Sequence, residues 1–110
     1  MIETIVRNYL IGAQALPVLF EHQAGMTEYY IIEKTGGGET NHIRSATMAI
    51  QSYAGTKERA AELNEALIEL MLGAVVLPEI SSVDLNASYD FTDVVAKAYR
   101  YQAVFDIVHY

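Results

Sequence analysis

The stretch that decides the fold is Tyr99–Tyr110, YRYQAVFDIVHY, which alternates over its whole length. Every second residue is apolar or aromatic, apart from the final histidine: Tyr99, Tyr101, Ala103, Phe105, Ile107 and His109. Successive side chains of a strand point to opposite faces, so this pattern predicts a strand with one apolar face. The stretch is longer than the usual strand of about five or six residues, and chain termini fray unless they are docked. We therefore expect this strand to lie inside a sheet or to pair with a neighbouring subunit.

Two helices are predicted upstream of this strand. Apolar residues recur at helical spacing over Ile2–Leu10, and Gly12 is a natural stop. A second apolar stripe runs over Ala60–Met71, with Thr56 as its N-cap and Gly73 as its end. Each helix has an apolar side and a polar side, which predicts that its apolar side packs against a sheet and its polar side faces water.

The remaining strands are short or interrupted. We expect strands at 18–20, 29–33, 43–53 and from Pro78 through Leu85, with Gly36, Gly37 and Gly38 forming the flexible tip of a hairpin. Asn86–Lys97 is expected to be a long polar and aromatic connection. Runs of strands separated by two helices predict an α+β fold: a single domain, 1–110, with a mainly antiparallel β-sheet packed against two α-helices on one face.

Composition excludes several classes of protein. The chain of 110 residues contains no cysteine, which excludes disulfides, thiol catalysis and thiolate metal sites and favours synthesis in a reducing cytoplasm. Its formal charge of -7 opposes approach to nucleic acid, so no specific nucleic-acid binding is expected. No apolar run approaches the ~18–20 residues of a membrane span, so we expect a soluble protein without a membrane partner.

No motif predicts a cofactor, a metal ion or catalysis. Lys34 precedes the three glycines, which is the wrong order for a phosphate-binding loop. The alternating polar residues Asp84–Asp90 resemble the start of a calcium loop, but Tyr89 and Val95 occupy the positions of its glycine and glutamate. The three histidines are isolated, and no serine lies in a nucleophile motif. The sequence therefore predicts no enzyme.

Tyrosine and phenylalanine are concentrated in the predicted strands and the long connection. Most of these rings are expected to pack across strands. Tyr89 and Phe91 lie in a polar segment, where a core position is hard to assign, so we place them at a protein–protein interface.

Several stretches together resemble small tail-completion proteins of tailed phages and Gram-positive prophages, the tail terminator and head–tail joining group of siphophages. They are Tyr30–Gly36 (YIIEKTG), Ala49–Ala54 (AIQSYA), Ala61–Asn64 (AELN), Tyr99–Ala103 (YRYQA) and Phe105–Val108 (FDIV). The resemblance spans nearly the whole chain and rests on structural patterns without a catalytic signature.

This resemblance implies a structural virion protein located in the tail or neck and made in the bacterial cytoplasm. Such a protein forms a homo-oligomeric ring, commonly a hexamer, that caps the tail tube and joins the tail to the head connector. Its partners would be itself, the tail-tube protein and the connector proteins, and acidic side chains facing the ring lumen would let DNA pass. The residues expected to contact neighbours are Gly36, Gly37, Gly38, Tyr89, Phe91, Asp93 and Tyr110.

Two alternatives stay open at this point. The chain is either a neck component on the head side, or a small ligand-binding or catalytic α+β domain whose aromatic strand faces line a pocket. A pocket that gathers His22, His42 or His109 would favour the second alternative.

Overall fold

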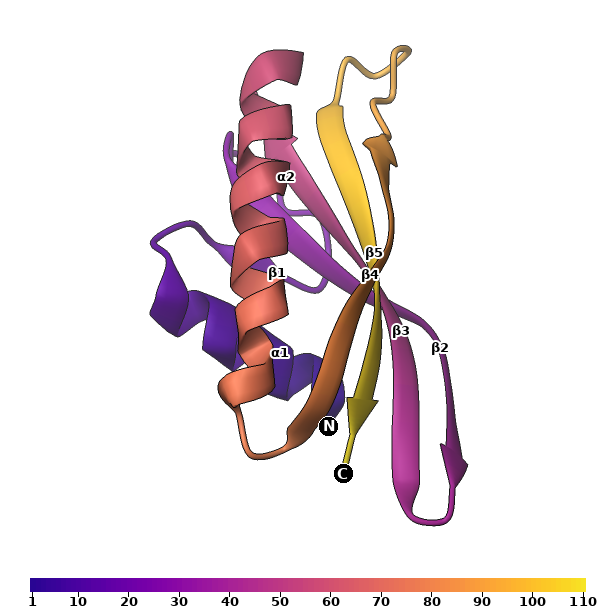
Figure 1. Cartoon of the computed structure of the whole chain (residues 1–110). Coiled ribbons are helices and arrows are strands. Elements are labelled where there is room, and N and C mark those ends of the chain that lie inside the picture. Colours follow the sequence, from indigo (N-terminus) through magenta and orange to yellow (C-terminus); the bar gives the residue numbers. More distant parts are fainter.

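The C-terminal strand β5 (Tyr99–His109) lies inside a sheet, as its alternating sequence predicts. The computed structural model describes residues 1–110, and its five strands are ordered β1-β2-β3-β5-β4 (Figure 1). The other strands are β1 (Val18–Leu19), β2 (Tyr29–Thr40), β3 (Ile43–Ala54) and β4 (Ile80–Asp90). Only the two-residue β1 runs parallel to its neighbour, and all other pairs are antiparallel.

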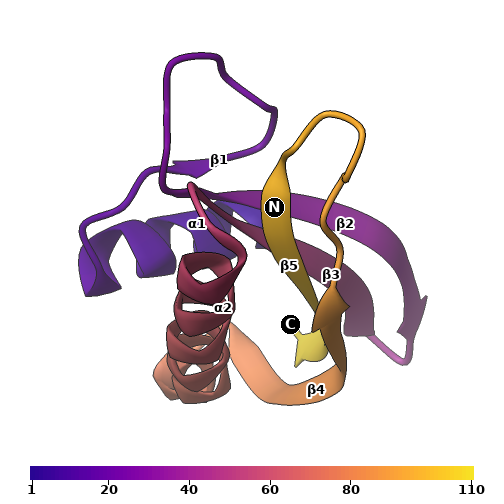
Figure 2. The same cartoon turned by 90° about the horizontal axis from the view of Figure 1, so that it is seen from above.

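Helices α1 (Ile2–Ala13) and α2 (Lys57–Leu72) cover the same face of this sheet (Figure 2). The 3-10 helix η1 (Gly73–Val76) continues α2 and leads into β4. The hydroxyl of Thr56 accepts a hydrogen bond from the backbone of Arg59 at 3.2 Å, which confirms the predicted N-cap of α2. The predicted α+β fold with a mainly antiparallel sheet and two helices is therefore confirmed.

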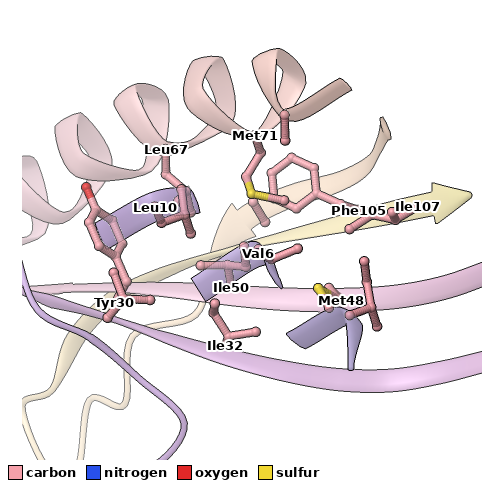
Figure 3. Packing of buried hydrophobic residues seen from close by; sticks show 14 of the residues in the cluster. Val6, Leu10, Tyr30, Ile32, Met48, Ile50, Leu67, Met71, Phe105 and Ile107 are labelled. Atoms are coloured by element: carbon pink, nitrogen blue, oxygen red, sulfur yellow. The ribbon is translucent and has the colours of Figure 1, made fainter. Parts of the chain in front are cut away.

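The main core lies between this face and the helices (Figure 3). Phe105 and Ile107 from β5 are fully buried together with Leu67 and Met71 from α2 and Leu10 from α1. Burying a large apolar side chain contributes about 1.5–3 kcal/mol. The apolar side chains that alternate along β5 therefore lie in the main core of the domain.

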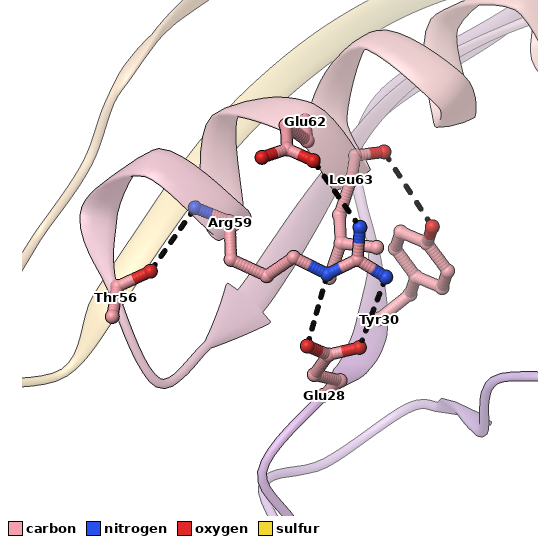
Figure 4. A network of polar contacts seen from close by, with 6 residues as sticks. All are labelled: Glu28, Tyr30, Thr56, Arg59, Glu62 and Leu63. Carbon is pink, nitrogen blue, oxygen red and sulfur yellow. Dashed lines mark hydrogen bonds and ion pairs between the residues drawn. The ribbon is translucent and has the colours of Figure 1, made fainter.

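The start of α2 is also tied to the segment before β2 by charge (Figure 4). The Arg59 guanidinium donates to the carboxylate of Glu28 at 3.0 and 3.3 Å and to that of Glu62 at 3.4 Å. These groups are largely exposed, where ion pairs contribute only about 0–1 kcal/mol each. These contacts therefore add little to the stability of the fold.

The hairpin turn and the end of α1 differ from the sequence prediction. Gly36, Gly37 and Gly38 are not a hairpin tip. They lie inside β2 and pair with Thr47, Ala46 and Ser45 of β3. The turn lies at Asn41 and His42, whose φ angles of 52° and 66° are left-handed and match a two-residue hairpin loop. Helix α1 continues through Gly12 and ends at Ala13.

The predicted connection over Asn86–Lys97 is also wrong in its first part. β4 continues through Asp90, so only Phe91–Ala98 connects it to β5. Its polar residues predict a loop, but β4 is an edge strand whose residues are largely exposed. An exposed edge strand tolerates polar residues, because much of its surface meets water.

Candidate protein interface

The face of the sheet opposite the helices is not covered by any helix, and we call it the open face. A second, smaller apolar cluster lies here, made of Tyr29, Ile31 and Tyr53. The rings of Tyr29 and Tyr53 are stacked, with centroids 4.6 Å apart and planes inclined by 6°. These rings are buried although no helix lies over them, because Leu19, Met26 and Ala98 pack against the cluster.

A chain of hydrogen bonds crosses three strands of the open face in one direction. Arg100 donates to the Tyr53 hydroxyl at 2.9 Å, and that hydroxyl donates to Gln51 Oε1 at 3.1 Å. Gln51 Nε2 then donates to Gln102 Oε1 at 2.9 Å, and Gln102 Nε2 donates to the Tyr89 hydroxyl at 2.5 Å. Chains of this kind polarise one another and fix side-chain positions. The last hydroxyl of the chain belongs to Tyr89, a residue that is 42% exposed. This hydroxyl accepts from Gln102, so its own proton is free to be donated to an acceptor outside the subunit.

His22 lies beside the tyrosine stack, with its ring centroid 5.8 Å from that of Tyr29 and 6.0 Å from that of Tyr53. Its Nδ1 is 2.6 Å from the Tyr29 hydroxyl, and burial raises the pKa of Tyr29 above the ordinary value. Together with Tyr29 and Tyr53, His22 lines a shallow hollow whose other residues include Met26 and Lys97. The lining contains no carboxylate, in a chain of formal charge -7.

The end of β4 and the start of the β4–β5 connection are held by aromatic and cationic contacts. The rings of Phe91 and Tyr89 pack edge to face with their centroids 6.0 Å apart, and the Arg100 guanidinium lies 4.5 Å from the centre of the Phe91 ring. Lys57, at the start of α2, lies 2.9 Å from Asp90. Hydrogen bonds from Thr92 and Lys57 hold the pKa of Asp90 at about 2.

The rest of the connection is a hydrogen-bonded turn that carries two exposed valines. Asp93 and Ala98 exchange two backbone hydrogen bonds of 3.0 Å, and the Asp93 carboxylate accepts from the backbone of Val95 and Ala96 at 3.1 Å. Val94 and Val95 are 81% and 96% exposed. We call residues 93–98 the tip. These hydrogen bonds restrict its backbone, which lowers the ordering entropy that binding would cost.

The opposite end of the molecule carries a different set of exposed side chains. The β2–β3 hairpin extends past the helices there and forms an arm (Figure 1). Val76, next to the start of β4, is 78% exposed and Tyr110 is 67% exposed. The longest dimension of the domain is 44 Å, against 25 and 22 Å across it.

The predicted interface residues therefore fall into two groups. Tyr89, Phe91 and Asp93 come together at the tip end, whereas the three glycines and Tyr110 lie at the arm end. Sequence reasoning missed the two tip valines, although adjacent β-branched residues inside a polar connection were a visible signal. It also missed the hydrogen-bond chain, because glutamines in a strand give no sign of which side chain they will meet.

The three histidines do not form one site. His22 lies beside the tyrosine stack, His42 in the hairpin turn and His109 at the end of β5. No group of three or more histidine, cysteine, aspartate or glutamate side chains is arranged to hold a metal ion. No helix combines the length and the apolar character needed to cross a membrane. Comparison with known proteins found no matching family model and no matching curated protein.

Proposed function

We propose that this chain is a structural virion protein that forms a ring, caps the tail tube of a siphophage and joins the tail to the head connector. The observation that carries the proposal is the exposure of apolar side chains at both ends of an elongated subunit. Val94 and Val95 are exposed at the tip end, and Val75 and Val76 at the other end. The sequence resemblance to tail-completion proteins supplies the biological setting.

A junction protein needs one contact surface for each partner. Full burial of a valine contributes about 1.5–3 kcal/mol, so a pair at each end is a sizeable source of binding energy. In a ring the same contact repeats in every subunit, which multiplies weak contacts into stable capping. The hydrogen bonds within the tip support this role, because they restrict the backbone that presents both valines.

The experiment is light scattering after size exclusion, on the protein alone over a concentration series and then with the tail-tube protein of the same phage. We expect a ring-sized species, either alone or only with tube protein. A monomer or dimer that ignores both tube and connector protein would contradict the proposal.

Two matched variants then assign the ends. The double variant Val94→Asp, Val95→Asp alters the tip, and Val75→Asp, Val76→Asp makes the same change at the other end. All four side chains are exposed, so both variants should fold. We expect one variant to lose tube protein while keeping connector protein, and the other to do the reverse. Retention of both partners by both folded variants would argue against contacts at the ends.

A small-ligand site is the second candidate function, and the hollow beside His22, Tyr29 and Tyr53 is the observation that favours it. Lys97 and His22 line it without a carboxylate, which suits a small anion. Native mass spectrometry of the freshly purified protein tests this candidate, because a retained metabolite would add a defined mass.

A further inference from the structure

The sheet of this protein ends in two unpaired strand edges. β2 pairs with β1 only through Tyr30 and Ile31, so its outer edge has no neighbouring strand from Ile32 to Thr40. β4 is the last strand at the other side, and its outer edge has no neighbour over Ile80–Asp90. Unpaired edges carry rows of backbone donors and acceptors that fit another extended strand.

The two edges match each other in direction. β2 is antiparallel to β3, β3 to β5 and β5 to β4, so β4 runs antiparallel to β2 within one subunit. A second copy placed beside the first in the same orientation would bring its β4 antiparallel to β2. The antiparallel ladder would then continue from copy to copy, and the open face would stay on one side throughout.

We propose that neighbouring subunits join by pairing the outer edge of β2 in one copy with the outer edge of β4 in the next. This inference rests on the proposed ring, to which it assigns the lateral joint. The contact is heterologous, since one edge meets a different edge, and a repeated rotation about an axis along the strands closes it into a ring. The joint uses the β2 side of the arm but neither the tip nor Val75 and Val76, so these exposed valines stay free for other partners.

The edges also carry features that limit pairing of the free subunit. The register shifts between Lys34 and Gly36 in β2, and it shifts twice in β4, around Ser81 and around Asn86. Such bulges disturb an edge as a template for unwanted strands. Each copy also carries a formal charge of -7, which opposes self-association at low ionic strength. Assembly would then depend on a template that holds several copies in position.

Disulfide trapping tests this joint, because the chain has no cysteine of its own. Thr35→Cys on β2 is combined in turn with Ser82→Cys, Asp84→Cys or Ser88→Cys on β4, so that the series covers several registers. A bridge requires Cα atoms about 4.4–6.8 Å apart, so only adjacent strands should react. The matched control combines Thr35→Cys with Glu65→Cys on the exposed side of α2.

After oxidation of the assembled protein, at least one β2–β4 pair should give a ladder of covalent oligomers in a denaturing gel without reductant. Each single-cysteine variant and the α2 control should remain monomeric. Rings that form without a ladder from any pair would overturn the joint and leave the proposed function standing. A covalent dimer from Thr35→Cys alone would also overturn it, since the β2 edges would then pair with each other. Failure to self-associate with or without tube protein would overturn both.

Discussion

The three glycines of β2 should respond differently to alanine, although they are adjacent. All three lie in β2, and none has a positive φ, so alanine can adopt their backbone conformations. A Cβ added at Gly37 would lie 2.9 Å from the carbonyl oxygen of Ser45, whereas at Gly36 or Gly38 its nearest atoms are 3.8 and 3.7 Å away. The first distance is a clash with backbone, and the other two are ordinary contacts.

The expected magnitudes follow from this geometry. Gly36→Ala and Gly38→Ala should each stabilise the protein by about 0.4–1 kcal/mol, because alanine reduces the entropy of the unfolded chain. Gly37→Ala should destabilise it by about 1–2 kcal/mol, because relieving an overpacked contact costs roughly 1–3 kcal/mol and the entropy gain offsets only part of that. The Ser45 carbonyl belongs to the paired strand β3, so it cannot move without disturbing the hairpin.

Urea unfolding followed by far-ultraviolet circular dichroism measures these differences, with the wild type as reference. A thermal scan should show the same order, since 1 kcal/mol corresponds to about 4 °C in a domain of this size. Equal effects at all three positions would refute the reasoning. In a flexible hairpin turn none of the three glycines would be held against the Ser45 carbonyl, so alanine would act alike at each. Destabilisation by Gly36→Ala alone would refute it as well.

Three further outcomes are expected. Gln102→Leu should lower the free energy of unfolding by about 1–3 kcal/mol in urea titrations, because it leaves the buried Gln51 Nε2 without an acceptor; an unchanged midpoint would contradict the hydrogen-bond chain. Asp90→Asn should lower the melting temperature at neutral pH, and the difference should vanish as the pH falls from about 4 towards 2, because the carboxylate with its folded pKa of about 2 stabilises the fold only while ionised; a difference that persists at pH 2 would point to another cause. Raising NaCl from about 0.05 to 0.5 M should increase the ring fraction in light scattering, since salt screens the repulsion between acidic copies; a decrease would indicate joints held by ion pairs.

Local periodicity carried the elements of the fold. The alternation of Tyr99–Tyr110 gave β5 and its buried face, and the apolar stripe after Thr56 gave α2 with its cap. These signals are local, because a strand or helix repeats its facing every two or 3.6 residues whatever its neighbours are. The α+β class followed from the order of these elements.

The extent of the edge strands was decided by pairing and not by local preference. Their sequence predicts a hairpin turn at Gly36, Gly37 and Gly38. Pairing with β3 instead keeps these glycines inside β2, and the turn lies at Asn41 and His42. The polar residues at the end of β4 predict a connection, yet they pair with β5 as far as Asp90. Long-range backbone hydrogen bonds override weak strand propensity, and the sequence alone does not show where they form.

The sequence by itself determined the composition of the candidate interface: an acidic chain without cysteine, with tyrosines and phenylalanines gathered outside α2. Only the tertiary structure decided how these residues are distributed. It separated the predicted interface residues into a tip end and an arm end, joined Arg100 to Tyr89 through Tyr53 and two glutamines, and left the edges of β2 and β4 unpaired. The physical reason is that a residue's own periodicity fixes which way its side chain points, whereas strand order and register fix what it meets.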